Sequence, residues 1–171
     1  RYISTQEICE IYIGTIDSFI WNITGKNQVG SLVGLAFASN TIDNCSSSGT
    51  VTGTRVVGGL VGYPYSSTIR NSYSTATANG GSGAYIGGLA GFVYSSTILN
   101  SYSTGSVVGG STYSGGLVGY KDAVSSVTDS FYDNTTSGQS DTGKGTGKTT
   151  AQMKTLANFN DTATTGLSTS W

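Results

Sequence analysis

Short apolar segments flanked by glycine recur along the chain, separated by longer polar stretches. They read GSLVGL at 30–35, GGLVGY at 58–63, GGLAGF at 87–92 and GGLVGY at 115–120. Their leucines, Leu32, Leu60, Leu89 and Leu117, lie 28, 29 and 28 residues apart. Such regular spacing is typical of stacked repeat architectures, whose periods run from about 20 to 50 residues. The pattern therefore predicts one structural unit that is repeated about four times.

An aliphatic residue stands at the head of each polar stretch. The stretches read TIDNCSSSGTVTG, TIRNSYSTATANG, TILNSYSTGSVVG and SVTDSFYDNTTSG, with a shorter relative, TIDSFIWNITG, at 15–25. Their aliphatic residues, Ile42, Ile69, Ile98 and Val127, are spaced by 27, 29 and 29 residues. Side chains of a strand alternate between two faces. In TIRNSYS we therefore expect Ile69, Asn71 and Tyr73 on one face, and the residues between and after them on the other.

Each repeat thus predicts an I-x-N-x-Y strand, a V-x-G strand and a G-L-V-G strand, with glycine and asparagine at the turns. We predict an all-β fold, a parallel β-solenoid of four to five coils of about 28 residues. Successive coils would stack about 4.8 Å apart, with the leucines in the core. The solenoid is assigned to residues 14–136, an entry strand or cap to residues 1–13, and a linker and closing segment to residues 137–171. Thr149 and Gln152 form a capping-box pattern, which predicts one short helix in that segment.

Composition supports this fold class. The chain has 26 glycines, 26 serines and 25 threonines, whereas charged residues make up only 10%. Glycine, serine and threonine disfavour a helix bundle, and the regularly placed aromatic residues disfavour disorder. A net charge of −1 gives no electrostatic reason to expect nucleic acid as a partner. No apolar run reaches 18 residues, so we expect no membrane span.

The unit NSYSTGSVVGGSTYSGGLVGY resembles the GLUG repeat of bacterial and archaeal surface proteins. This repeat also occurs as an appendage of streptococcal IgA-specific metallopeptidases. The ending DSFYDNTTSGQSDTGKGTGKTTAQMK is similar to the segment that closes such arrays, so the resemblance covers roughly residues 15–155. It departs at Ser31 and Leu35, where later copies have glycine and an aromatic residue. The resemblance implies an architecture and an extracellular or cell-surface location, and it is poor as a guide to activity.

Residues that could carry catalysis or bind a metal are few. The chain has no histidine, which excludes the HExxH zinc site and the Ser-His-Asp triad. Asp129 and Asp133 could form a glycosidase pair or hold a structural ion, but solvated surface carboxylates are the favoured interpretation. TGKGTGKT at 142–149 lacks the first glycine of a phosphate-binding loop. Lys144, Lys148 and Lys154 give the closing segment a positive bias, for which a solvated face is the favoured interpretation. We expect a protein that is not an enzyme and needs no cofactor or metal.

Two cysteines and four glycosylation sequons fit a secreted protein. Cys9 and Cys45 predict a disulfide that pins the N-terminal cap onto the first full coil. The alternative is two buried small residues, because Cys45 occupies the column of Ser72, Ser101 and Ser130. The sequons, at Asn22, Asn44, Asn134 and Asn160, predict N-glycosylation only weakly in a sequence this rich in serine and threonine.

Aromatic residues form two columns when the repeats are aligned. The first column is Tyr73, Tyr102 and Phe131, and the second is Tyr63, Phe92 and Tyr120. Such columns can bind sugars or proteins, although stabilisation of the coil by stacked side chains is the favoured interpretation.

The expected function is that of an extracellular structural module. We expect a subunit of a cell-surface filament that assembles head to tail through open strand edges at the solenoid ends. The alternative is a monomeric adhesin domain that binds surface glycans, or proteins of a host or neighbouring cell, through the aromatic columns. A polysaccharide-acting enzyme is a third alternative.

Overall fold

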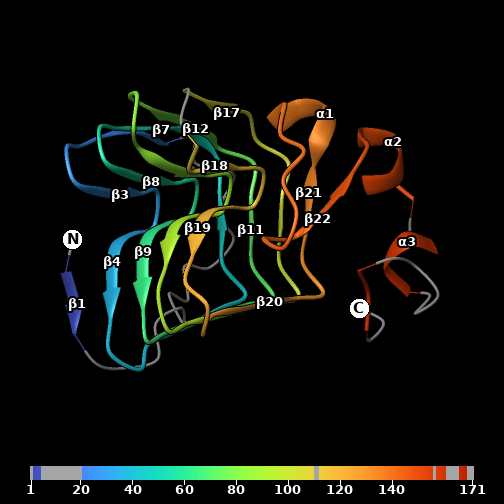
Figure 1. Cartoon of the computed structure of the whole chain (residues 1–171), viewed down its shortest axis with the longest axis horizontal. Coiled ribbons are helices and arrows are strands. Elements are labelled where there is room, and N and C mark those ends of the chain that lie inside the picture. Colours follow the sequence, from blue (N-terminus) through green and yellow to red (C-terminus); the bar gives the residue numbers. More distant parts are fainter. Residues whose placement is uncertain (1, 5–20, 110–111, 156, 161–165, 169–171) are drawn as a thin grey trace.

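The chain winds into a stack of about four coils. The computed structural model describes residues 2–4, 21–109, 112–155, 157–160 and 166–168. Figure 1 shows the coils side by side, running from the N-terminal to the C-terminal end of the stack. Within this described part, every strand pairing is parallel and joins one coil to the next. The predicted parallel β-solenoid is confirmed.

Five sheets run along the stack, and each coil contributes one short strand to each sheet. The first sheet has the order β1 (Tyr2–Ser4), β4 (Val33–Phe37), β9 (Val61–Tyr65), β14 (Ala90–Val93) and β19 (Val118–Lys121). The second sheet has the order β20 (Ser126–Thr128), β15 (Thr97–Leu99), β10 (Thr68–Arg70) and β5 (Thr41–Asp43). The third has the order β22 (Thr146–Lys148), β21 (Phe131–Asp133), β16 (Tyr102–Ser103), β11 (Tyr73–Ser74) and β6 (Ser46–Ser47).

The two remaining sheets close each coil. The fourth sheet has the order β17 (Val107–Val108), β12 (Thr77–Gly80), β7 (Gly49–Gly53) and β2 (Trp21–Thr24). The fifth has the order β18 (Ser114–Gly115), β13 (Tyr85–Gly87), β8 (Val56–Gly58) and β3 (Gln28–Gly30). The prediction of three strands per coil is therefore wrong, because turns divide two of the three predicted strands and each full coil has five.

The first division falls inside the I-x-N-x-Y segment. Asn71 has a left-handed backbone, with φ of 50°, and its equivalents in the other coils do too. Asparagine tolerates this conformation better than most residues, so the chain turns there from β10 into β11. The expected alternation breaks at this turn: Ile69 is buried, but Tyr73 is exposed and Ser72 is buried instead.

The second division explains why the apolar segments carry paired glycines. A Cβ atom on Gly59 would lie 2.1 Å from the carbonyl oxygen of Gly88 and 2.3 Å from Ser74 Oγ. A Cβ atom on Gly88 would meet the carbonyl oxygen of Gly116 at 2.2 Å. Only glycine allows the coils to approach this closely. The glycines thus let each leucine turn inward between the fifth-sheet strand and the first-sheet strand of its own coil.

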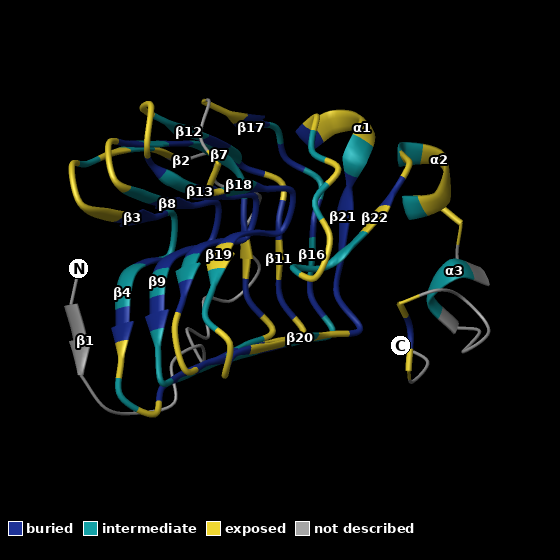
Figure 2. Cartoon of the chain, viewed as in Figure 1, coloured by how far each residue is buried: buried dark blue, intermediate teal, exposed yellow. Residues whose placement is uncertain are grey.

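The core follows the two predicted ladders. Strand pairing places Ile69 between Ile42 and Ile98, and Ile98 next to Val127. Leu60, Leu89 and Leu117 are fully buried in the same cluster, while Leu32 and Val127 are partly buried against it. A second cluster, centred on Val51, Val57 and Ile86, fills the space near the fourth and fifth sheets. Figure 2 shows the buried positions following one another from coil to coil.

Buried serines link the coils through their side chains. Ser101 Oγ accepts a hydrogen bond from the amide of Ser72 at 3.3 Å and donates one to the carbonyl of Leu99 at 2.8 Å. Ser72 and Ser130 repeat this arrangement one coil earlier and one coil later. Each hydroxyl therefore satisfies a buried amide of the preceding coil, and these serines form a ladder parallel to the solenoid axis.

Short helices cover the C-terminal end of the stack beyond β21 and β22 (Figure 1). They are α1 (Asn134–Ser137), α2 (Thr150–Met153) and α3 (Ala157–Asn160). Thr149 and Gln152 form the predicted capping box at the start of α2. The predicted single helix is divided in two: α2 ends with Lys154 as its C-cap, and Asn158 Nδ2 donates a hydrogen bond to the carbonyl oxygen of Gln152 at 2.9 Å. None of the described helices has the length and apolar character needed to cross a membrane.

Candidate functional site

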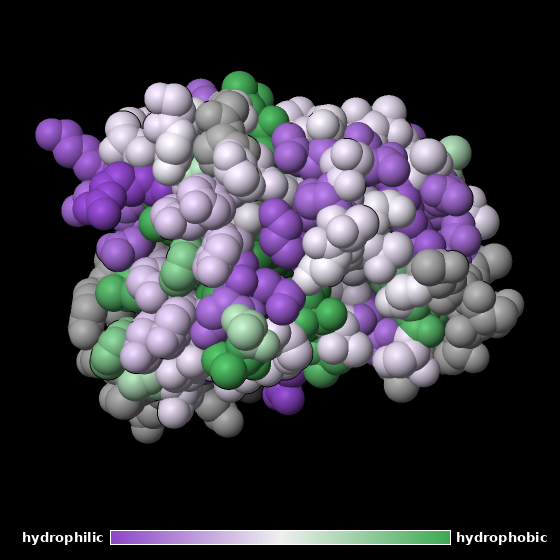
Figure 3. All heavy atoms as spheres, in the orientation of Figure 1, coloured by the Kyte–Doolittle hydropathy of each residue, from purple (hydrophilic) through white to green (hydrophobic). Residues whose placement is uncertain are grey.

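Aromatic rings gather on the outer side of the first sheet and the adjoining edge of the fifth. In the described part of the chain the connected rings are Phe37, Tyr63, Tyr65, Tyr85, Phe92, Tyr94, Tyr113 and Tyr120. We call this group the aromatic face. Figure 3 shows the surface above β4, β9 and β19 as a mixture of pale purple and green. Exposed aromatic clusters of this kind mark interaction surfaces.

The rings of the aromatic face are stacked along the solenoid axis. Phe37 and Tyr65 have centroids 4.9 Å apart with an interplanar angle of 21°, and Tyr65 and Tyr94 are 5.1 Å apart at 12°. Phe92 and Tyr120 repeat this geometry at 5.1 Å and 13°. Because adjacent rings cover each other's faces, the columns offer mainly ring edges to a partner. A sugar ring has no room to stack between them, so protein contacts fit this surface better.

Only part of the aromatic face was predicted from the sequence. Tyr63, Phe92 and Tyr120 lie on it as one column, whereas the column of Phe37, Tyr65 and Tyr94 was missed. The signal was available, because an aromatic residue stands two positions after Leu35, Tyr63 and Phe92, on the same side of each strand.

The other predicted column lies on the outer side of the third sheet. Tyr73 and Tyr102 stack at 5.0 Å with an interplanar angle of only 3°. Burial raises the pKa of the Tyr102 phenol, with a smaller contribution from Tyr73. Phe131 continues the column but is fully buried, and the ring of Phe159 meets it edge-on at 5.3 Å. Phe131 is therefore not available to a ligand.

A groove of about 590 Å³ opens beside this column, between the third sheet and the C-terminal helices. Tyr102, Met153 and Phe159 give it an apolar wall, and Asp133 and Lys154 also line it. Its size is within the usual range of small-molecule sites, about 300–1,000 Å³.

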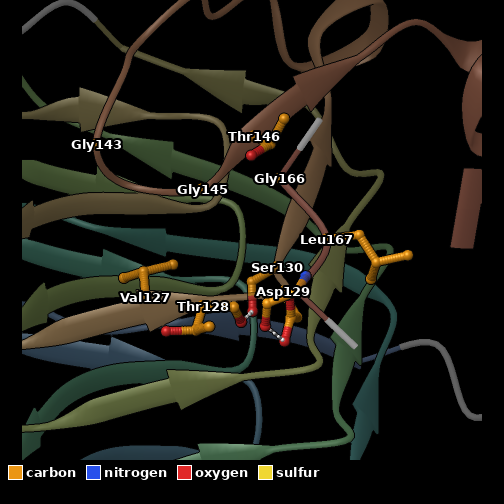
Figure 4. Close-up of a pocket in the computed structure, with 10 residues that line it drawn as sticks. Val127, Thr128, Asp129, Ser130, Gly143, Gly145, Thr146, Gly166 and Leu167 are labelled. Atoms are coloured by element: carbon orange, nitrogen blue, oxygen red, sulfur yellow. Dashed lines mark hydrogen bonds between the residues drawn. The ribbon is translucent and has the colours of Figure 1, made fainter. Parts of the chain in front are cut away.

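The predicted carboxylate pair is not a solvated surface pair. Asp129 and Asp133 are 4% and 2% exposed. Asp129 accepts hydrogen bonds from the amide and the hydroxyl of Ser168, beside a pocket of about 370 Å³ (Figure 4). Asp133 is the N-cap of α1 and accepts from the amides of Thr135 and Thr136. Both carboxylates thus stabilise the backbone of the C-terminal segment. Across the described ranges, no group of three or more His, Cys, Asp or Glu side chains could hold a metal ion.

The expected solvated basic face is also wrong for two of its three lysines. Lys144 Nζ donates hydrogen bonds to the carbonyls of Ser114 at 3.0 Å and Gly119 at 2.7 Å, and lies 3.8 Å from Asp141 Oδ2. Burial lowers the pKa of Lys144, and Asp141 opposes that shift. Lys148 is only 6% exposed, whereas Lys154 is exposed as expected.

Asp141 completes a polar plug with Lys144 at the C-terminal end of the core. Asp141 Oδ1 accepts from the amide of Gly116 at 2.8 Å, and its carbonyl accepts from Tyr132 Oη at 2.8 Å. Strands β18 and β19 are the last strands of their sheets, so their outer edges would otherwise be open. We call Tyr132, Asp141 and Lys144 the C-terminal plug.

The remaining predicted sites are only partly within the described residues. Cys45 is disulfide-bonded, and Cys9, the predicted partner, lies outside the described residues. Asn22 and Asn44 are exposed and Asn134 is half-buried. The side chain of Asn160 also lies outside the described residues.

Comparison with protein families matches the GLUG motif to residues 25–52, 53–79 and 82–108. The chain is a GLUG-repeat protein. Each matched GLUG span has about the length of one coil, and the coil that begins at β18 follows the third span. Comparison of the GLUG chain with curated proteins and with solved structures gives no match.

Proposed function

We propose that this GLUG-repeat protein is a non-enzymatic structural module of the cell exterior that associates side by side with a second copy through its aromatic face. The main support is the aromatic face. Four of its side chains are between 37% and 42% exposed: Phe37, Tyr94, Tyr113 and Tyr120. A net charge of −1 leaves little repulsion between copies. Contact across a shared face would be isologous and would close as a pair.

The buried polar side chains bind the backbone of the protein itself, which supports a structural role. The buried serines bind backbone groups of neighbouring coils, and Asp129 and Asp133 hold the C-terminal segment in place. The disulfide at Cys45 favours an oxidising compartment and so supports an extracellular location.

The C-terminal plug favours lateral association over end-to-end growth. Head-to-tail assembly needs free backbone groups at the strand edges. Lys144 occupies the carbonyls of Ser114 and Gly119, and Asp141 occupies the amide of Gly116. The filament predicted from the sequence therefore requires displacement of the plug, and the adhesin alternative requires a glycan or a different protein on the aromatic columns.

Sedimentation velocity with electron microscopy of the native protein tests the proposal. We expect a concentration-dependent dimer and paired short rods. Tyr65→Ser combined with Tyr94→Ser should give monomer, whereas Val108→Ser, which removes an apolar side chain that is 47% exposed on the fourth sheet, should still dimerise. Long fibres would support the filament and contradict lateral pairing. A monomer at every concentration would leave the aromatic face to another protein and overturn the proposal.

A further inference from the structure

The groove between the third sheet and the C-terminal helices has the features of a ligand site. Its volume is about 590 Å³, and its wall is largely apolar through Tyr102, Met153 and Phe159. Binding sites for small molecules combine such walls with a few polar groups that fix orientation. The groove lies on the third sheet, away from the first-sheet strands that carry most of the aromatic face.

Asp133 provides a polar group with spare capacity in this wall. Both hydrogen bonds of its carboxylate use Oδ1, which accepts from the amides of Thr135 at 2.9 Å and Thr136 at 3.1 Å. In the described part of the chain, no hydrogen bond reaches Oδ2. Oδ2 does not belong to the fully buried side-chain atoms that lack a hydrogen-bond partner. Because Asp133 lines the groove, Oδ2 is open to it. A side chain that is 2% exposed thus retains an acceptor atom for a ligand with hydrogen-bond donors.

The charges that line the groove cancel. Among the residues that line it, Asp133 carries one negative charge and Lys154 carries one positive charge. A ligand with a net charge of either sign would meet one of these two groups as a like charge. The fitting ligand is therefore neutral, has hydroxyl donors, and has an apolar side that can lie against aromatic and thioether groups.

We propose that this groove binds one unit of a neutral sugar, with Asp133 Oδ2 accepting hydrogen bonds from sugar hydroxyls and Tyr102, Met153 and Phe159 contacting its apolar side. The sugar does not enter a stack of rings, because the groove lies beside the Tyr73–Tyr102 column. This inference does not depend on pairing through the aromatic face.

The only methionine of the chain, Met153, gives a direct readout of the groove. Protein labelled with ¹³C at the methionine methyl group should give a single signal. We expect it to shift saturably during titration with at least one of the methyl glycosides of glucose, galactose, mannose and N-acetylglucosamine.

The variant Asp133→Asn tests the part that the carboxylate plays in binding while keeping its part in the fold. Asparagine is as good an N-cap as aspartate, so α1 should remain intact. Loss of the charged acceptor should weaken binding about tenfold or more. Asp122→Asn, a matched change at another aspartate that binds a backbone amide, should leave the affinity unchanged. Tyr102→Leu should also weaken binding, and thermal unfolding of each variant checks that the fold is retained.

Three outcomes would overturn the sugar site. The first is an unmoved Met153 signal with all four glycosides, and the second is undiminished binding by Asp133→Asn. The third is a signal that moves with tetramethylammonium chloride but not with sugars, which would make the groove a cation site. Sedimentation reports on the aromatic face independently, so either proposal can fail alone.

Discussion

At the scale of single residues, the buried serine ladder links neighbouring coils through hydrogen bonds between uncharged groups. Ser101 is fully buried and connects its own coil to the preceding one through two hydrogen bonds. A buried amide that loses its acceptor retains the full cost of its desolvation. Small hydroxyl groups thus determine how tightly the coils adhere.

Ser101→Ala should lower the free energy of unfolding by about 1–3 kcal/mol, because the Ser72 amide loses its acceptor. Urea unfolding followed by circular dichroism measures the loss. Ser82→Ala, at an exposed position in the same repeat, should change stability by less than about 0.5 kcal/mol. Equal effects at both positions would contradict a special role for the ladder.

Tyr132 should make the stability of the protein depend on alkaline pH. Burial and, to a smaller extent, Asp141 raise the pKa of Tyr132 from 10.0 to about 12. The folded state therefore holds this proton more tightly, so the contribution is complete below pH 10 and is lost as pH rises through about 12.

Tyr132→Phe should remove that contribution, so the stability difference from wild type should narrow between pH 10 and pH 12. Taking the difference matters because the lowered pKa values of Lys144 and Lys148 make stability change in the opposite direction as the pH rises toward their usual value of 10.5. Denaturant titrations at several pH values measure it. A constant difference would contradict the raised pKa of Tyr132.

At the scale of elements, the turn between the fifth and first sheets depends on glycine. Gly88→Ala should destabilise the protein by about 1–3 kcal/mol or more, because its Cβ would meet a backbone carbonyl and Ser103 Oγ. Thermal unfolding checks this. Gly81→Ala is the matched control. It should be close to neutral, because a Cβ atom there would lie 3.9 Å from its nearest neighbour, the carbonyl oxygen of Thr54.

The elements also show what the sequence can and cannot predict. Periodic leucine and isoleucine positions identified the coils, because residues of equal spacing stack on one another. The turn at Asn71 was missed, because the alternation of side chains placed Asn71 inside one strand and does not reveal a left-handed backbone at that residue. The plug formed by Asp141 and Lys144 was also missed, since the loop lies outside the repeat and nothing in the local pattern brings it to Gly116.

The groove escaped prediction for a related reason. It joins Tyr102 of a repeat to Met153 and Phe159 of the nonrepetitive C-terminal segment. The sequence singled out Tyr102 and Asp133 separately, but only the fold brings them to one cavity.

At the scale of the whole molecule, the C-terminal plug occupies backbone groups at two strand edges, so we expect it to limit end-to-end growth of the rod. Lys144→Ala should free the carbonyls of Ser114 and Gly119 at two strand edges. We expect lower stability, by about 1–3 kcal/mol, and the appearance of end-to-end aggregates in electron micrographs. Lys154→Ala, at an exposed lysine of the same segment, should do neither. Short rods only, in both variants, would contradict an edge-protecting role for Lys144.

The serine ladder has a mechanical consequence. Each coil contacts mainly the coil before it and the coil after it, and the ladder repeats the same bonds at every junction. Tension applied along the chain would therefore peel the rod one coil at a time, and each step would release about 90–100 Å of extended chain from a repeat of about 28 residues. A rod built this way would therefore lengthen in equal increments under load, one coil at a time.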